Sequence, residues 1–281
     1  MLDTNKLFTS DYEAEAKRIV TFIRKHFVSC PRKKIVLGLS GGIDSALCAS
    51  LYCRAIGPKN VHVVLMPALN SSKTSEEHAG KQARVLGIPR ENIHYQPLGK
   101  QLQAFGFSGK ELKKGSARIG NIAARLRMIN LFDIADNVGL PRRFVRRSFN
   151  EGGSDAKAGA IVSGTENLTE YFLGYFTIGG DAVSIIEPIH HLYKWEVRGL
   201  AEFLGVIEEI RNKKPSAELW EGQTDEGELG FSYNEADITL VCVNSKKKPA
   251  DYGISESVAA KVLARVNYTE FKRHLPVHLK R

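Results

Sequence analysis

The sequence predicts an α/β protein built on a doubly wound, Rossmann-like parallel sheet with helices on both faces. Short apolar runs rich in β-branched residues alternate with longer stretches of helical periodicity, which is typical of parallel strands joined by right-handed crossovers. A glycine turn directly follows the first apolar run, where parallel sheets bind their ligands. The length of 281 residues suits one large domain over 1–281.

The N-terminal part is expected to supply a helix, a strand and a second helix. Ser10 and Glu13 have the spacing of a capping box, and apolar residues then recur at helical spacing, which predicts a helix over 10–28. The mostly apolar run 34–39 predicts a buried strand. A helical stretch over 43–56 begins immediately after the glycine turn.

The same alternation continues towards the C-terminus. Apolar residues 61–66 predict a second strand, which Pro67 ends. Residues 117–137 predict a long helix with one face marked by Ile122, Leu126, Ile129 and Asp133. The remaining elements expected are strands near 93–95 and 160–163, an extended run over 183–186, and helices over 75–86, 194–204 and about 255–267.

Two long stretches lack periodicity and predict mobile loops. Residues 213–231 are polar, and residues 141–158 combine glycine-rich sequence with four arginines, Arg142, Arg143, Arg146 and Arg147. Long irregular loops in compact domains are often lids over a site.

Composition narrows the cellular setting. No apolar run approaches the length of a membrane span, and the first residues lack a signal-peptide core. The four cysteines form no C-x-x-C pair, which favours free thiols in a reducing cytoplasm. The formal charge of +9 favours anionic partners, either nucleotides or nucleic acid.

Residues 40–45 read Ser-Gly-Gly-Ile-Asp-Ser and predict a phosphate-binding loop. Backbone N–H groups and the N-terminus of the next helix favour an anion there, and the two glycines let it approach the main chain. Asp44 can hold a divalent cation beside the phosphates. The loop is not a Walker A loop, because no lysine follows its glycines, and it lacks the G-x-G-x-x-G dinucleotide fingerprint. A structural turn without a ligand is the alternative.

One further acid and three basic residues could take part in the chemistry. Glu170 follows the strand at 160–163, shares a helical face with Glu166, and could join Asp44 on a magnesium ion. Its alternative role is that of a helix-start acid. Lys194 begins a helix, where its charge is unfavourable unless an anion lies nearby. Arg125 and Arg127 point in different directions from one helix, so both cannot enter one pocket.

Seven segments share the pattern of one family: 38–45, 120–125, 164–166, 174–177, 192–194, 215–226 and 269–273. Together, they resemble the ammonia-dependent NAD⁺ synthetase family, whose members are ATP pyrophosphatases of the adenine nucleotide alpha hydrolase-like fold. The segment 215–226 is the most specific of them. The loop 38–45 alone would also fit GMP synthetase, asparagine synthetase or tRNA-modifying relatives.

The resemblance implies a two-step amidation. The nicotinate carboxylate of deamido-NAD attacks the ATP α-phosphate, pyrophosphate leaves, and free ammonia then displaces AMP from the acyl-adenylate. The resemblance also implies Mg²⁺, a homodimer, a cytoplasmic location, and no membrane or nucleic-acid partner.

The family's functional positions carry over residue by residue. They place Asp44, Glu170 and Lys194 in catalysis, with Asp44 and Glu170 as the magnesium ligands. ATP would contact Gly38, Leu39, Ser40, Gly41, Gly42, Ile43, Asp44, Ser45, Thr165, Lys194 and Ser216. Deamido-NAD would contact Arg125, Asp181 and Lys272.

Three acceptor positions depart from the family pattern. Ile178 stands where a lysine is usual, Ile185 where an acidic residue is usual, and Phe271 where a histidine is usual. The first alternative is therefore the same chemistry on a different carboxylate. A tRNA-modifying enzyme that uses the arginines of 141–158 is the second alternative, and a non-catalytic nucleotide-binding regulator is the third.

Overall fold

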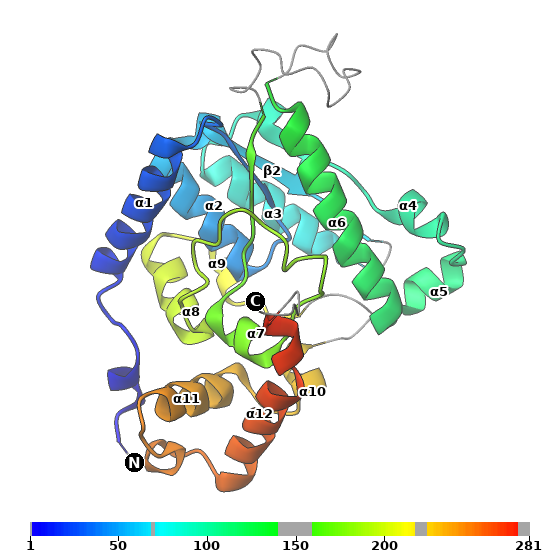
Figure 1. Ribbon diagram of the computed structural model, residues 1–281. Coiled ribbons are helices and arrows are strands. Elements are labelled where there is room, and N and C mark those ends of the chain that lie inside the picture. Colours follow the sequence, from blue (N-terminus) through cyan, green and yellow to red (C-terminus); the bar gives the residue numbers. More distant parts are fainter. Residues whose placement is uncertain (1, 69–70, 140–158, 217–223, 275–281) are drawn as a thin grey trace, which may run out of the picture.

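The computed structural model describes residues 2–68, 71–139, 159–216 and 224–274 (Figure 1). Its centre is a sheet of four parallel strands in the order β3-β2-β1-β4. The strands are β1 (Ile35–Gly38), β2 (Val61–Leu65), β3 (Ile93–Tyr95) and β4 (Ile161–Ser163). Ile35 of β1 lies opposite Val61 of β2 and Ile161 of β4. The strand order reverses between β1 and β4, and such a switch point is where doubly wound sheets bind ligands.

The helices vary from one turn to six. They are α1 (Tyr12–Ser29), α2 (Ile43–Ile56), α3 (Lys73–Val85), α4 (Gly99–Gln103), α5 (Gly109–Lys114), α6 (Ala117–Asn137), α7 (Leu168–Leu173), α8 (Lys194–Phe203), α9 (Glu208–Arg211), α10 (Asp225–Leu229), α11 (Tyr233–Asn244) and α12 (Glu256–Tyr268). Short 3₁₀ helices span Thr4–Leu7, Pro58–Asn60, Arg90–Asn92, Pro249–Tyr252 and Glu270–Arg273. None of the helices in the described part of the chain is long and apolar enough to cross a membrane.

A hydrophobic core lies on each face of the sheet, and alternate residues of a strand point into one core or the other. In β1, Ile35 and Leu37 face the core that α1, α2 and α8 cover, while Val36 faces the core under α6. Helices therefore cover both faces of the sheet, as the sequence predicted (Figure 1). A third core joins α7, α11 and α12 at the end of the molecule that also carries the N-terminus (Figure 1).

Several elements confirm the sequence-based expectations, and α2, α6 and β3 have the predicted bounds. The start of α1 differs, because Asp11 caps it by accepting a hydrogen bond from the Ala14 N–H, so Ser10 is not the cap. Helix α3 begins at Lys73, two residues before the predicted start.

The predicted face of α6 is wrong in one respect. Ile129 is 55% exposed, because the buried side of the helix runs through Ile119, Ala123, Leu126 and Asn130. Both sets of residues have helical spacing and share Leu126, so periodicity alone could not separate them.

Three other expectations change. The run 183–186 adds no strand and contributes a single bridge between Ser163 and Ile186. In the stretch 213–231, residues 225–229 form α10 and residues 217–223 lie outside the described part of the chain, as does the predicted loop 141–158. Glu166 precedes α7, whose cap is Asn167, so Glu166 and Glu170 are not on one helical face.

Candidate functional site

The loop after β1 is shaped by its glycines. Gly41 has φ +79°, and a Cβ there would lie 2.3 Å from the Ser75 carbonyl oxygen, so only glycine fits. Gly42 is the N-cap of α2 and supplies no side chain to its first N–H groups. The Ser40 N–H donates to Ser45 Oγ over 3.3 Å, and the two serine hydroxyls lie 3.2 Å apart. This leaves a helix N-terminus flanked by hydroxyls, which suits phosphate.

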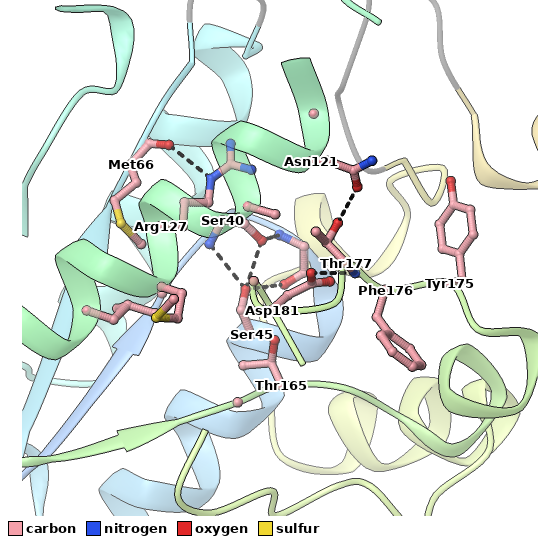
Figure 2. A pocket seen from close by; sticks show the side chains of 18 of the residues that line it. Ser40, Ser45, Met66, Asn121, Arg127, Thr165, Tyr175, Phe176, Thr177 and Asp181 are labelled. Carbon is pink, nitrogen blue, oxygen red and sulfur yellow. Dashed lines mark hydrogen bonds between the residues drawn. The ribbon is translucent and has the colours of Figure 1, made fainter. Parts of the chain in front are cut away.

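A cavity of about 480 Å³ opens at the carboxyl ends of β1, β2 and β4, at the switch point of the sheet (Figure 2). The predicted ATP residues that line it are Gly38, Leu39, Ser40, Gly42, Ser45, Thr165 and Ser216. The predicted acceptor residues Asp181 and Lys272 also line it. The backbone fold thus brings together residues from widely separated segments. Gly41 and Ile43 belong to the same loop but are not among the lining residues.

Lys194 lies beside the loop as a buried cation. Its side chain is 3% exposed, and its ammonium donates to Asp44 Oδ2 over 2.6 Å and to Glu170 Oε1 over 2.9 Å. It also lies 5.0 Å from the centre of the Tyr233 ring. Burial alone would lower the pKa of Lys194, but the two carboxylates outweigh burial and raise it above the ordinary lysine value. The three predicted catalytic residues therefore form one cluster.

A smaller cavity of about 110 Å³ adjoins this cluster and is lined by both Asp44 and Glu170. The other Asp44 oxygen, Oδ1, accepts a hydrogen bond from Asn167 Nδ2 over 2.9 Å. Within the described ranges, no group of three or more His, Cys, Asp or Glu side chains could hold a metal. Two carboxylates still fit Mg²⁺, because that ion usually takes one or two carboxylates and completes its shell with phosphate oxygens and water.

Two buried glutamates near this cavity have raised pKa values. Burial raises the pKa of Glu166 to about 9, helped by the nearby Glu170 and Glu187. Burial also raises the pKa of Glu187 to about 7. Glu187 accepts hydrogen bonds from the Glu166 N–H over 3.2 Å and from the Ser184 hydroxyl over 2.7 Å. Its carboxylate occupies the space that a Cβ on Gly164 would need. Sequence reasoning missed Glu187, because its role depends on this close approach.

The two arginines of α6 point in different directions, as helical geometry predicted. Arg127 lines the larger cavity, and its Nε donates to the Met66 carbonyl over 3.4 Å (Figure 2). Arg125 does not line the cavity, and its Nε donates to the Ile178 carbonyl over 3.2 Å. The assignment of Arg125 to the acceptor therefore stays a prediction, and Arg127 is the arginine on the cavity wall.

The other two residues predicted to bind the acceptor, Asp181 and Lys272, meet at the loop 174–181. Asp181 Oδ1 accepts from the Thr177 N–H over 2.8 Å, and the Thr177 hydroxyl donates to Asn121 on α6 (Figure 2). The Lys272 ammonium donates to the Gly174 and Phe176 carbonyls and lies 4.4 Å from the centre of the Phe176 ring. Lys272 therefore ties the C-terminal 3₁₀ helix to this loop.

The three departures from the family pattern lie outside the cavity lining. Ile185 is 51% exposed and Phe271 is 60% exposed, while Ile178 is half-buried. None of the three is among the residues that line either cavity.

Two tyrosines and one aspartate form a buried network that the sequence did not reveal. The hydroxyls of Tyr175 and Tyr233 each donate to Asp225 over 3.1 Å. Tyr175 lines both cavities, and the Tyr233 ring contacts Lys194. The network connects α10 to the catalytic cluster.

The model of a protein family described as NAD synthase matches residues 15–140 and 153–276 of this chain. An NH₃-dependent NAD⁺ synthetase from Chlorobaculum parvum is 37% identical over 271 residues, which cover 95% of this chain and 89% of that protein. The enzyme of the same name from Pelodictyon phaeoclathratiforme is 41% identical over 247 residues, covering 86% of this chain and 80% of that protein.

Two solved structures are similar to this chain over nearly its whole length. The structure of NMN synthetase from Francisella tularensis superposes with a TM-score of 0.76 at 27% identity, covering 97% of this chain and 100% of that chain. An NH₃-dependent NAD synthetase from Campylobacter jejuni superposes with a TM-score of 0.70 at 29% identity, covering 96% of this chain and 100% of that chain.

Proposed function

This chain belongs to the NAD synthase family, and on that premise we propose how its residues carry out the family's reaction. The protein is an enzyme that amidates the nicotinate carboxylate of deamido-NAD with ammonia and ATP, giving NAD⁺, AMP and pyrophosphate. The residue assignments rest mainly on one observation, the cluster of Asp44, Glu170 and Lys194 beside the predicted phosphate-binding loop 40–45. Family membership favours this ligase over the tRNA-modifying enzyme and the non-catalytic regulator.

In the proposed arrangement, the N-terminus of α2 and the hydroxyls of Ser40 and Ser45 hold the ATP phosphates. Thr165 and Ser216, which line the same cavity, would also contact the nucleotide. Arg127 adds a cation on the α6 side, where its guanidinium faces anionic groups of either substrate. Such fixed donors stabilise the charge that develops on the phosphates when the α–β bond breaks.

Asp44 and Glu170 would hold Mg²⁺, which when bound neutralises negative charge on the ATP phosphates. Lys194 lies between these carboxylates and would keep its proton, since they raise its pKa. Lys194 is not among the residues that line either cavity, so its positive charge would act on the phosphates from behind Asp44 and Glu170. The protein's contribution to both steps is positioning and charge stabilisation.

Deamido-NAD would contact Asp181 and Lys272 on the acceptor side of the cavity, with its nicotinate carboxylate directed at the ATP α-phosphate. Arg125 lines neither cavity and donates to the Ile178 carbonyl, so it would contact a part of the dinucleotide that extends beyond the cavity. We also propose a homodimer, in which exposed apolar side chains such as Ile129 and Ile185 become covered. Light scattering of the purified 31.2 kDa chain would then give about twice its mass. A monomer at micromolar concentration would contradict the homodimer. A cytoplasmic location fits the free thiols of the four cysteines.

A second candidate acceptor is the mononucleotide that carries the same nicotinate carboxylate. The specific observation is that Ile178 and Ile185 replace the charged residues usual in the family, while the Francisella tularensis structure similar to this chain is an NMN synthetase. An acceptor that lacks the second nucleotide would need fewer charged contacts beyond the cavity, where Ile178 and Ile185 lie.

Mass spectrometry of reaction products tests both candidates. Purified protein is incubated with ATP, Mg²⁺ and ammonium salt, together with deamido-NAD or nicotinate mononucleotide in parallel. We expect NAD⁺, AMP and pyrophosphate from deamido-NAD at the higher kcat/KM. A higher kcat/KM for the mononucleotide would favour the second candidate, and ADP with phosphate as products would overturn the chemistry.

A further inference from the structure

Asp237 on α11 is a fully buried carboxylate that the reaction described above does not use. Its Oδ1 accepts a hydrogen bond from the Thr169 hydroxyl over 2.5 Å, and its Oδ2 accepts one from the Trp195 N–H over 2.7 Å. The Thr169 hydroxyl oxygen in turn accepts from the Lys194 N–H over 2.9 Å. One side chain thus connects α7, α8 and α11.

These contacts lie directly beside the catalytic cluster. Thr169 precedes Glu170 on α7, while Lys194 and Trp195 are the first two residues of α8. The first N–H groups of a helix have no partner within that helix, and Tyr193 at the N-cap offers them no side-chain hydrogen bond. The Asp237–Thr169 pair supplies the missing acceptors and thereby fixes the backbone of both residues whose side chains meet in the ion pair.

We propose that Asp237 is a positioning residue for the amidation reaction, which holds Lys194 and Glu170 in register through Thr169 and the first turn of α8. This rests on the roles proposed above for Lys194 and Glu170. Asp237 touches neither cavity, so it acts only through its neighbours.

The energetics favour a geometric role over a purely stabilising one. Burial raises the pKa of Asp237 to about 7, which means that its charged form is costly in this environment. Apolar residues of similar volume often replace buried charges without loss of stability. A carboxylate here has a specific use, because it accepts two hydrogen bonds in fixed directions from two different helices.

Two substitutions test the proposal, each with a different defect. Thr169→Val keeps the shape of the fully buried side chain but removes the hydroxyl that links Asp237 to the Lys194 N–H. Asp237→Asn replaces one acceptor oxygen by a donor, and it keeps the test possible if Thr169→Val does not fold. Thr169→Ser restores the hydroxyl.

Thr239→Val is the matched control. Thr239 is as buried as Thr169 and lies two residues from Asp237 on α11, but its hydroxyl donates to the Glu235 carbonyl in the same helix. It loses a buried hydroxyl without touching the link to the catalytic cluster.

The measurements are kcat, the KM for deamido-NAD, and backbone hydrogen exchange at Lys194 and Trp195. We expect Thr169→Val and Asp237→Asn to lower kcat by at least tenfold, up to about 100-fold, with little change in KM and with faster exchange at both N–H groups. Thr169→Ser should recover most of kcat, and Thr239→Val should stay within about twofold of the unmodified protein.

Three results would overturn the proposal: kcat within twofold in both test variants, a loss of kcat without faster exchange, or an equal loss in Thr239→Val. If the unmodified protein made no NAD⁺, the proposed function would fail separately. Hydrogen exchange can be measured without turnover. Faster exchange at Lys194 and Trp195 in Asp237→Asn would then still support the positioning of α8 by Asp237, and unchanged exchange would overturn that positioning role.

Discussion

At the scale of single residues, the site depends on one buried cation held between two carboxylates. Lys194 is 3% exposed and forms ion pairs with Asp44 and Glu170 at 2.6 Å and 2.9 Å. The sequence predicted all three as catalytic residues, but their ion pairing depends on the chain bringing positions 44, 170 and 194 together. The sequence pattern alone gives no distances between these three positions.

Replacing Lys194 by methionine should damage both activity and stability. The substitution leaves two carboxylates that are 18% and 17% exposed without their cation, and for a fully buried pair such a loss costs about 3–5 kcal/mol in the free energy of unfolding. We expect kcat to fall by at least about 100-fold. Added Mg²⁺ should raise the melting temperature of Lys194→Met more than that of the unmodified protein, because the carboxylates can then bind the ion.

Lys17→Met is the control for this variant. Lys17 also pairs with a carboxylate, Glu13 at 2.7 Å, but both side chains are mostly exposed. Removing an exposed pair should leave both the free energy of unfolding and kcat essentially unchanged, because solvent screens the interaction. Retention of kcat in Lys194→Met would contradict the role given to this lysine.

The raised pKa of Glu187 predicts that the free energy of unfolding depends on pH. Because burial raises its pKa to about 7, the folded state keeps a proton that the unfolded state releases above its ordinary pKa of about 4.5. Its contribution to stability is therefore fully present below that ordinary value and is lost as the pH rises through 7. In Glu187→Gln, the decline in the free energy of unfolding between pH 5 and 8 should be smaller by about 2–3 kcal/mol.

Chemical denaturation at each pH gives these free energies. Glu256→Gln, a change at an exposed position of α12, serves as the control and should keep the slope of the unmodified protein. An unchanged slope in Glu187→Gln would mean that this carboxyl group is ionised at neutral pH in the folded protein.

At the scale of elements, the sequence best predicted the position of the loop between β1 and α2, the predicted phosphate-binding loop. The bounds of α2 agree, because an apolar strand, two glycines and a helical pattern follow each other within a few residues. By contrast, α11 was not predicted. Its residues from Tyr233 to Cys242 are buried on nearly all sides, so the helix lacks the amphipathic periodicity by which helices are recognised.

The loop predicts a sharp requirement for glycine at position 41. Gly41→Ala would combine a positive φ with a Cβ 2.3 Å from the Ser75 carbonyl, so the backbone must shift. We expect the KM for ATP to rise at least tenfold and the free energy of unfolding to fall by about 1–3 kcal/mol.

Gly87→Ala separates strain from contact in that experiment. Gly87 also has a positive φ of +69°, but no atom lies within 4 Å of a Cβ placed there. It should lose about 1–2 kcal/mol of stability from backbone strain alone and keep the KM for ATP. An unchanged KM in Gly41→Ala would show that the loop does not approach the nucleotide.

At the scale of the whole molecule, the catalytic cluster lies where the sheet meets the C-terminal helices. Asp44 comes from α2 at the sheet, while Glu170 and Lys194 come from α7 and α8, which pack against α11. The sequence predicted the parallel sheet and its helices on both faces, and most of the site residues that it predicted line one of the two cavities. It could not predict Arg127, Glu187 or Asp237 as site neighbours, because those roles come from tertiary contacts between distant segments.

The transfer of oxygen between substrates tests the central claim, that the cavity joins the nicotinate carboxylate to the α-phosphate of ATP. Deamido-NAD with ¹⁸O at both carboxylate oxygens is converted in the presence of ATP, Mg²⁺ and ammonia. The masses of the products are then measured by mass spectrometry. An acyl-adenylate predicts that AMP carries one ¹⁸O atom, because the carboxylate oxygen bonded to phosphorus leaves with AMP when ammonia attacks. Label in inorganic phosphate, or AMP without label, would contradict this account.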